Sequence, residues 1–429
     1  MEENYNEIVK ETVYKDQLAN GLTVLMMPRK NYNRKYGILA ANFGSIDTHF
    51  VNPFSGKETT VPDGIAHFLE HKLFEGEKGD VFSIFAQTGA SANAFTNYTT
   101  TAYLFSSTDK FKENMLNLLN FVQEPFFTEE NVDKEKGIIS QEIKMYQDNP
   151  DYQVYKNTLK GLFHNHPVKN DIAGTIDTIR QISVDDLSLC YQLFYNPGNM
   201  VFFLTGGFEP EEIIYTIKEN QSSKNFNPWK NIKRIFPAEP ATIRQSSISK
   251  EMDVNNNLLY LGIKENILPA SPQKMLVQEL STKILLELII GKGSALYQNL
   301  YEKGLIDNNF SYEYVIHKNY GYLLMGGETK DSKLLSKYLL NGINQGYKQI
   351  RYNDFTRYIR KHTGKFIKSL NSFNKVAYNY IDLFFKDLDY FDLFEELKDL
   401  DFSFLKKRYH DLFKEENYVQ SIIKEKIWL

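Results

Sequence analysis

The sequence predicts an α+β protein of two homologous domains, each an antiparallel sheet with helices packed on one face. Three observations lead to this prediction. Pairs of strand-like segments are followed by longer helical segments, the same order of elements occurs twice along the 429 residues, and a polar stretch with three prolines separates the two copies. We therefore expect an N-terminal domain over residues 1–220, a linker over 221–242 and a C-terminal homologous domain over 243–429.

Hydrophobic periodicity predicts the elements of the first half in chain order. Strands over residues 22–28 and 36–47 precede a helix over 63–74, because apolar residues recur every three or four positions in the third segment. Turn residues separate the later elements. These are a short helix from Gly79, strands at 91–95 and 100–106, helices at 110–123 and 129–147, helical pieces to about 194, a strand at 200–205 and a helix at 210–219.

The second half repeats this order after the linker. Two strands precede two helices, two more strands follow, and further helices lead to a final strand. The strands are predicted at 246–253, 257–263, 310–316, 320–326 and 418–423, and the first two helices at 272–290 and 295–303.

Composition narrows the classes of function. The chain carries 50 Lys and Arg against 54 Asp and Glu, a net charge of -4, without a basic run that could follow a phosphate backbone. We therefore expect no nucleic-acid partner. The one cysteine, Cys190, cannot form an internal disulfide, and residues 1–10 lack the features of a signal peptide. No apolar run approaches the roughly 20 residues that span a bilayer, so we expect a cytoplasmic protein without a membrane segment.

The segment GIAHFLEHKLF, residues 64–74, carries the strongest chemical signal in the chain. It places His67 and His71 four residues apart, which on a helix puts both imidazoles on one face with Glu70 at its edge. A catalytic Zn²⁺ takes three protein ligands plus water, and a carboxylate beside that water can act as a general base. Two packed or surface histidines are the alternative, but a His-x-x-Glu-His pattern seldom arises by chance.

A third ligand is expected from the helix over 129–147, which carries acids on an otherwise apolar stripe. The stripe consists of Glu135, Ile138, Ile139, Glu142 and Tyr146. Acids on a core-facing stripe are costly unless they are paired or bound to a metal ion. The alternative is that both acids lie at the margin of the stripe and contact lysines such as Lys134 or Lys136.

Taken together, these segments resemble the pitrilysin/insulinase family of zinc metallopeptidases, which has an inverted zinc motif and includes the mitochondrial processing peptidase. The likeness extends to residues 89–105, 166–183, 195–208 and 291–304, and therefore covers most of the chain. The half-size bacterial branch with two homologous domains is the most similar group. The resemblance implies the fold of the mitochondrial processing peptidase for each domain.

The resemblance also implies a role for each residue of the motif. His67, His71 and Glu142 match the ligands of Zn²⁺. Glu70 matches the general base that takes a proton from the attacking water and passes it to the leaving amine. Glu135 matches a second acid of the same helix, which orients a ligand histidine.

Ala92, Asn93 and Ala94 match the edge strand on which this family lays its substrate peptide. A peptide added to a sheet edge gains main-chain hydrogen bonds whatever its sequence, so selectivity must come from pockets and available space. Asn93 is a candidate contact to a substrate carbonyl. An asparagine at a turn or a strand end is the alternative for this residue.

The second half departs from the family pattern at two positions. Tyr301 and Asp307 stand where members that complete their own site carry a substrate-holding arginine and tyrosine. A carboxylate cannot stabilise a developing oxyanion, which needs donors or positive charge. Tyr312 or Tyr314 could replace the missing tyrosine, and the spacing favours neither.

The prediction is a zinc endopeptidase that hydrolyses short or unfolded peptides as the zinc-bearing subunit of a heterodimer. The expected partner is a homologous subunit that lacks the zinc motif and carries the arginine and tyrosine. The alternative is a non-catalytic, peptide-binding or structural subunit of the same fold. Retention of the complete set His67, Glu70, His71 and Glu142 favours the enzyme.

Overall fold

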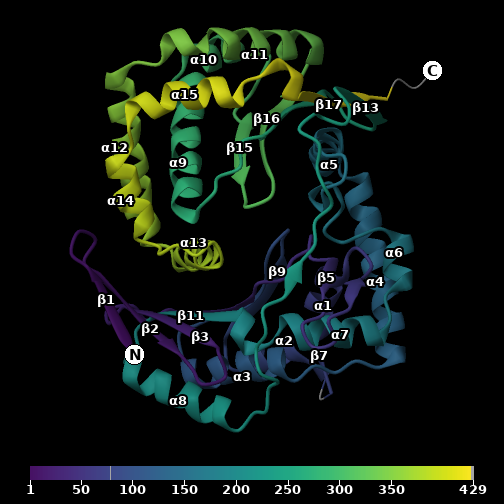
Figure 1. The fold of residues 1–429 in the computed structure, drawn as a ribbon, viewed down its shortest axis with the longest axis vertical. Helices are drawn as coiled ribbons and strands as arrows, with labels where there is room; N and C mark the ends of the chain where they lie inside the picture. Colours follow the sequence, from purple (N-terminus) through teal and green to yellow (C-terminus); the bar gives the residue numbers. More distant parts are fainter. Residues whose placement is uncertain (78, 427–429) are drawn as a thin grey trace. The chain divides into compact units, whose positions relative to one another are not determined.

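The computed structural model describes residues 1–77 and 79–426 and divides into two compact units, both drawn in Figure 1. Each unit contains segments from both halves of the sequence. Unit 1 consists of residues 1–143, 171–236 and 369–385, and unit 2 of residues 144–170, 237–368 and 386–426. The division into domains at residues 221–242 stays a prediction.

Unit 1 is built on a seven-stranded sheet with the order β1-β2-β3-β11-β4-β10-β9. Neighbouring strands are antiparallel except for β3 and β11, which run parallel. The strands are β1 (Glu2–Asn6), β2 (Glu11–Gln17), β3 (Thr23–Pro28), β4 (Lys35–Ala41), β9 (Ser91–Thr96), β10 (Thr101–Ser107) and β11 (Met200–Gly206). Short ladders are formed by β5 (His49–Val51), β6 (Glu58–Thr60) and β12 (Lys233–Arg234), and by β7 (Glu75–Gly76) and β8 (Gly79–Asp80).

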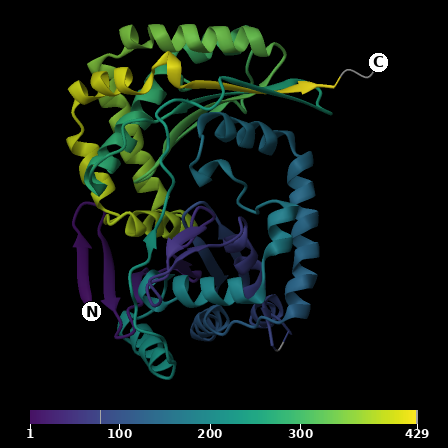
Figure 2. The same cartoon turned by 45° about the vertical axis from the view of Figure 1, so that its right-hand side comes forward.

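A layer of helices covers one face of this sheet, as Figures 1 and 2 show. Alternate strand residues such as Leu39 and Ala41 of β4 and Phe202 and Leu204 of β11 are buried against it, as the period of two along a strand requires. The helices are α1 (Ile65–Leu73), α2 (Val81–Gln87), α3 (Phe111–Gln123), α4 (Glu129–Asp148), α6 (Ile176–Gln181), α7 (Val184–Phe194) and α8 (Pro210–Ser222), with a 3₁₀ turn at η2 (Pro197–Asn199).

Unit 2 is built on a five-stranded sheet with the order β13-β17-β14-β16-β15, in which β13 and β17 are parallel. Its strands are β13 (Ser247–Met252), β14 (Asn257–Lys264), β15 (Ser311–Ile316), β16 (Gly321–Thr329) and β17 (Tyr418–Glu425). Its α-helices are α5 (Pro150–Leu162), α9 (Pro272–Ile289), α10 (Ala295–Glu302), α11 (Ser332–Gly346), α12 (Tyr352–Ser369), α14 (Asp392–Asp399) and α15 (Phe402–Leu412). The 3₁₀ turns are η1 (Pro167–Lys169), η3 (Tyr347–Gln349) and η4 (Glu415–Asn417).

The two sheets repeat one topology. The order β3-β11-β4-β10-β9 in unit 1 corresponds strand by strand to β13-β17-β14-β16-β15 in unit 2, and the parallel pair occupies the same place in both. Each parallel pair joins the first and last strands of its repeat, which are linked by a long connection rather than a hairpin. The α+β fold predicted from the sequence is confirmed, with this one parallel pair added to each sheet.

In each unit, one helix comes from the other half of the sequence and packs on the sheet. Helix α5 follows β10 and α4 in the sequence, yet it packs on β14 and β17 in unit 2. A Cβ at Gly262 of β14 would come within 2.3 Å of the Thr158 side chain of α5, so the approach depends on glycine. The helix at the same place in the second repeat is α13 (Phe373–Phe385), and it packs on β4 and β11 in unit 1.

The residues that hold α13 to unit 1 are mostly aromatic. Tyr380 is buried with its ring centroid 5.2 Å from that of Phe203 on β11. The Arg29 side chain donates to the carbonyl oxygen of Leu370, just before the helix, and its guanidinium lies 5.6 Å from the ring of Phe373. Helix α13 therefore covers the face of the sheet that the main helix layer leaves open (Figure 2).

Most predicted elements lie within a few residues of the observed ones, such as the helix expected at 110–123 and found at Phe111–Gln123. Strands β1 and β2 were not predicted, because residues 2–17 are rich in charged and amide side chains without a clear apolar alternation. Among the described residues, no helix combines the length and apolar character needed to cross a bilayer.

We predict that Tyr380→Ala destabilises the protein by about 3–5 kcal/mol, the usual cost of removing a large ring from a packed core. Urea denaturation followed by circular dichroism measures the change. Tyr215→Ala is the matched control, because Tyr215 lies on α8 of unit 1 and is 65% exposed. A loss no larger than that of the control would contradict the role given to α13.

Candidate metal centre

Helix α1 presents two histidines to α4 and begins after a glycine that close packing requires. The N-terminal cap Gly64 has a φ of 94°, in the left-handed region, and a Cβ there would lie 2.6 Å from the carbonyl oxygen of Ala173. One face of the helix is buried in the core of unit 1, through Ile65, Ala66, Phe68, Leu69 and Leu73. His67 and His71 lie on a different face, which is turned toward α4.

Three side chains from α1 and α4 converge on one point. One ligand atom each from His67, His71 and Glu142 lies within 4.8 Å of the other two. The Nε2 atom of His67 is 3.7 Å from Oε1 of Glu142, and the Nε2 atom of His71 is 3.4 Å from Oε2. Ligands of a tetrahedral Zn²⁺ with bonds of about 2.0–2.1 Å stand roughly 3.3 Å apart. The donor set and its spacing therefore fit one such ion.

Glu135 contacts the ring nitrogen of His71 that does not face Glu142. Its side chain is almost fully buried, and its Oε1 atom lies 3.0 Å from Nδ1 of His71. When Nδ1–H donates to this carboxylate, the lone pair of Nε2 points toward Glu142 and is available to a metal ion. Lys134 and Lys136 are engaged elsewhere, with Glu75 and Asp133 respectively.

The stripe expected on α4 was wrong at one position. Ile138 is 47% exposed, whereas Ile139 and Ile143 are buried. Adjacent residues of an α-helix are about 100° apart around the axis. The buried side of α4 is centred nearer Ile139, so Glu135 shares it and Ile138 does not.

The electrostatics of the group favour a bound cation. Burial, aided by the charge of His71, lowers the pKa of His67 to about 4, so this imidazole is neutral and able to ligate. Burial acts in the same direction on His71, but hydrogen bonds to Glu135 and Glu142 outweigh it and raise its pKa to about 10. The two carboxylates thus hold a proton on His71 at neutral pH, and a divalent ion would take over that positive charge.

Glu70 connects α1 to the edge of the sheet. Its Oε2 atom accepts a hydrogen bond from Oγ1 of Thr96, at the end of β9, over 2.6 Å. Burial raises the pKa of Glu70, while the bond from Thr96 and the charge of His71 act in the opposite direction. Thr96 was not among the predicted site residues, although the alternation of a strand places it on the same face as Ala92 and Ala94.

Strand β9 is the last strand of its sheet. Ala92 and Ala94 pack against the core beneath the helix layer, and Asn93 is exposed on the opposite face. The Oδ1 atom of Asn93 accepts a hydrogen bond from the backbone N–H of Ala94 over 2.9 Å. An edge strand with small side chains leaves its outer backbone groups accessible to another extended chain.

The positions singled out in the second half lie in unit 2. Tyr301 of α10 is 47% exposed, and Asp307 accepts hydrogen bonds from the backbone and side chain of Asn309. Tyr314 is buried, and its hydroxyl donates to Glu265 over 2.9 Å. Tyr312, two residues earlier on the same face of β15, is only partly buried. Tyr314 is therefore committed to a buried network.

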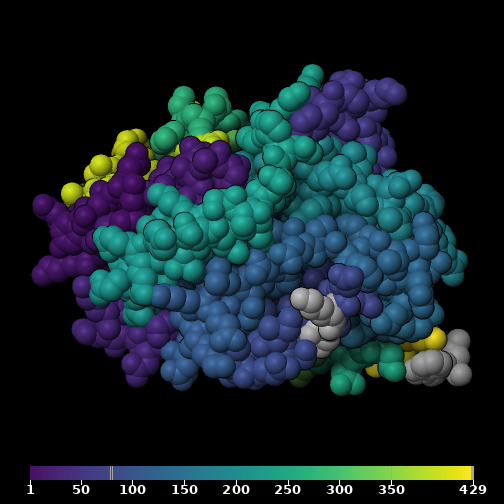
Figure 3. All heavy atoms as spheres, turned by 90° about the horizontal axis from the view of Figure 1, so that it is seen from below, coloured from purple at the N-terminus to yellow at the C-terminus, as the bar shows by residue number. Residues whose placement is uncertain are grey.

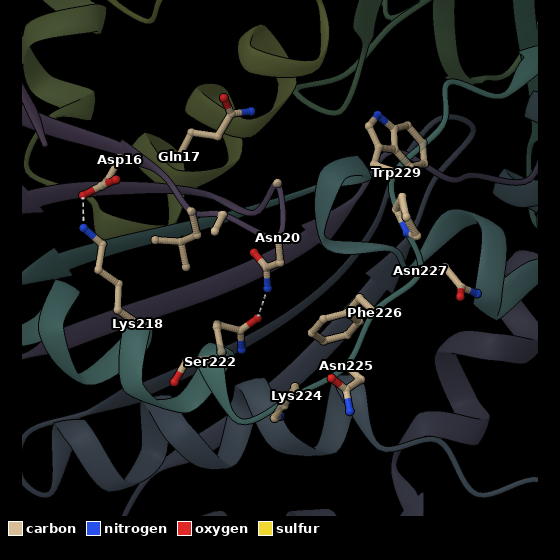
Figure 4. A pocket seen from close by; sticks show the side chains of 15 residues that line it. Asp16, Gln17, Asn20, Lys218, Ser222, Lys224, Asn225, Phe226, Asn227 and Trp229 are labelled. Carbon is tan, nitrogen blue, oxygen red and sulfur yellow. Dashed lines mark hydrogen bonds and ion pairs between the residues drawn. The ribbon is translucent and has the colours of Figure 1, made fainter.

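A separate cavity of about 930 Å³ lies in unit 1 between the β2–β3 turn and the end of α8. Two hydrogen bonds join side chains that line this cavity, as the dashed lines in Figure 4 mark. Lys218 donates to Asp16 and Asn20 donates to Gln221, each over 2.9 Å. In the view from below in Figure 3, the teal atoms of α8 and the loop after it lie on the visible face of unit 1. None of the predicted site residues lines this cavity.

Comparisons with known proteins identify related sequences. Residues 51–176 match the family model described as insulinase (peptidase family M16), and residues 181–361 match the peptidase M16 inactive domain. The uncharacterized zinc protease YmfH of Bacillus subtilis is 40% identical over 394 residues, which cover 92% of this chain and 92% of YmfH.

Solved structures share the fold over almost the whole chain. An M16-like peptidase from Alicyclobacillus acidocaldarius has 36% identity and a TM-score of 0.93, covering 97% of this chain and 99% of that one. The periplasmic protease PqqL of Escherichia coli, at 17% identity and a TM-score of 0.77, matches 99% of this chain with 48% of its own length. This second likeness concerns the fold alone.

We predict that Glu135→Gln weakens divalent-metal binding by about 10- to 100-fold, the usual effect of removing a carboxylate that orients a ligand histidine. Competition with a chromophoric chelator measures the affinity. Glu130→Gln is the matched control, because Glu130 is an exposed acid on the same helix. Equal metal affinities for both variants would mean that Glu135 does not contribute to metal binding.

Proposed function

The chain belongs to the insulinase family of peptidases, family M16, and from this premise we propose that it is a zinc-dependent endopeptidase of short or unfolded peptides. One observation carries the proposal. Ligand atoms of His67, His71 and Glu142 lie within 4.8 Å of one another. Glu70, which lies on α1 with the two histidines, is hydrogen-bonded to the edge strand β9. A metal position, a base and a peptide-binding edge thus meet in one unit.

The proposed cofactor is Zn²⁺, held by His67, His71 and Glu142. Relatives such as YmfH are named zinc proteases, and two imidazoles with one carboxylate form a donor set typical of catalytic zinc. When bound, this ion supplies Lewis-acid chemistry, which activates water and polarises a carbonyl group. Glu135 keeps the His71 ring in the orientation that binding requires.

Glu70 is the proposed general base. Its carboxylate takes a proton from the attacking water and delivers it to the amine nitrogen as the peptide bond breaks. Burial raises its pKa, which makes the carboxylate a better proton acceptor than an exposed glutamate. The hydroxyl of Thr96 fixes one oxygen of Glu70, so the other oxygen can face the water.

The proposed substrate lies extended along β9, beside Ala92, Asn93 and Ala94. Pairing with a sheet edge requires a peptide whose own backbone hydrogen bonds are free, which excludes segments inside folded domains. Asn93 then exchanges its bond with the Ala94 N–H for a contact with the peptide main chain. Short or unfolded peptides are the substrates that meet this requirement.

We also propose a homologous partner subunit. Tyr301 and Asp307 supply no positive charge where the family resemblance places an arginine and a tyrosine, and this chain corresponds in length to about half of PqqL. A homologue without the zinc motif would contribute those donors to a heterodimer. The proposed compartment is the cytoplasm, in keeping with a lone, buried cysteine, Cys190.

A non-catalytic subunit of the same fold is the alternative. In its favour, residues 181–361 match a model named for an inactive domain. The residues of the metal centre, however, lie in the segment 51–176 that matches the insulinase model. The enzyme therefore remains the better proposal.

We predict that His71→Ala lowers the zinc content from about one ion per chain to near zero, because one of three ligands is lost. Glu70→Gln keeps the zinc and lowers peptide hydrolysis by about 10²- to 10⁴-fold, the usual contribution of a general base. Atomic absorption and a fluorogenic peptide assay measure the two effects, with the exposed His410→Ala as control. Unchanged zinc in His71→Ala would refute the ligand assignment.

We predict that a homologous chain carrying the arginine and tyrosine raises turnover by about 10²- to 10³-fold, the usual value of an oxyanion donor. The assay compares this chain alone, the partner alone and the mixture. The same partner with its arginine replaced by alanine is the control. Full zinc-dependent turnover by the lone chain, with no gain on mixing, would reject the heterodimer.

A further inference from the structure

Strand β9 presents different side chains on its two faces. Ala92, Ala94 and Thr96 lie on the face of the helix layer, where Thr96 reaches Glu70. Asn93 and Phe95 lie on the opposite face, because successive strand residues alternate. The side chains of a peptide paired with β9 alternate in the same way, so half of them lie on the face of the sheet that carries Phe95.

The face that carries Phe95 is the one that α13 covers. The ring of Tyr378 meets the ring of Phe95 edge to face, with centroids 5.2 Å apart and an interplanar angle of 83°. Tyr378 is 38% exposed and Phe95 is only partly buried. The two rings therefore form a partly open aromatic wall beside the free edge of β9, and all of these residues belong to unit 1.

Packing holds Tyr378 in this position. The first turn of α13 is fixed by Phe373. The ring of Phe373 is 5.3 Å from that of Tyr32 and lies under the guanidinium of Arg29. Arg29 is in turn paired with Glu11 of β2 over 2.7 Å. Tyr36 of β4 is buried close to the Tyr378 hydroxyl, and burial together with Tyr378 raises the pKa of Tyr36. A rigid wall of this kind selects more sharply than a mobile side chain.

We propose that Tyr378 is a specificity-determining residue, and that with Phe95 it selects peptides bearing a large aromatic or aliphatic side chain opposite Phe95. Residues directly opposite across paired strands have Cβ atoms about 4.5–5.5 Å apart, so such a side chain reaches both rings. A ring placed there gains an edge-to-face contact in addition to apolar burial. The alanines on the other face offer space without an aromatic contact. This inference rests on the proposed peptide cleavage and adds the class of peptide.

The test measures peptide binding and cleavage separately. A set of extended peptides, each with one phenylalanine moved along an otherwise alanine- and serine-rich sequence, is bound to the zinc-loaded Glu70→Gln protein and followed by fluorescence anisotropy. The same set is digested by protein with Glu70 intact. We expect one position at which phenylalanine is preferred over alanine, and a 2- to 10-fold loss of that preference in Tyr378→Ala, the range expected for one aromatic pair.

Matched variants separate selection from stability. Tyr378→Phe keeps the ring and is expected to keep the preference, and the exposed Tyr215→Ala is expected to change nothing. Phe95→Ala is expected to lose the same preference, which tests the wall if Tyr378→Ala folds poorly. The double variant loses no more than the larger single loss, because both rings act on one side chain.

The inference is overturned if Tyr378→Ala and Phe95→Ala retain the preference, or if they weaken all peptides equally, as a purely structural role would. Failure of the proposed function looks different. In that case the protein with Glu70 intact cleaves no peptide even when zinc and a partner chain are supplied.

Discussion

The way in which α1 faces α4 depends on the balance of charge between their side chains. Glu135 and Glu142 of α4 and Glu70 of α1 surround two imidazoles in a largely buried place. Buried carboxylates are stable only with compensating positive charge. Without a metal ion the group holds a proton on His71, whose pKa is raised to about 10 despite burial. A divalent ion bound by His67, His71 and Glu142, as proposed, would supply the same positive charge.

The repeat topology explains why such a group can be built with little strain. Five strands of the unit 1 sheet have the same order as the sheet of unit 2, and each sheet is covered on one face by a helix from the other repeat, α13 in unit 1 and α5 in unit 2. The sheet that carries β9 is therefore packed on both faces and is free at its edge. A rigid sheet holds Thr96, and through it Glu70, at a fixed position relative to the edge strand. Preorganisation of this kind is what a base and a metal site require.

The sequence predicted the parts of the centre that depend on local spacing. The interval between His67 and His71 and the interval between Glu135 and Glu142 each fit one helix face, and both pairs meet in the structure. Contacts that depend on tertiary packing were not predictable in this way. Thr96 reaches Glu70 across 26 residues, and Tyr378 reaches Phe95 from the second repeat. Periodicity shows that a segment is helical, but not which sheet it covers, so the exchange of α5 and α13 and the parallel strand pairs were missed.

We propose that α1 and α4 form one zinc site from His67, His71 and Glu142. Anomalous diffraction at the zinc absorption edge, on crystals of the zinc-loaded protein, tests it most directly. One peak per chain is expected, at about 2.0–2.2 Å from Nε2 of each histidine and from a carboxylate oxygen of Glu142. A zinc peak bound by other residues, with none between these three side chains, would contradict it.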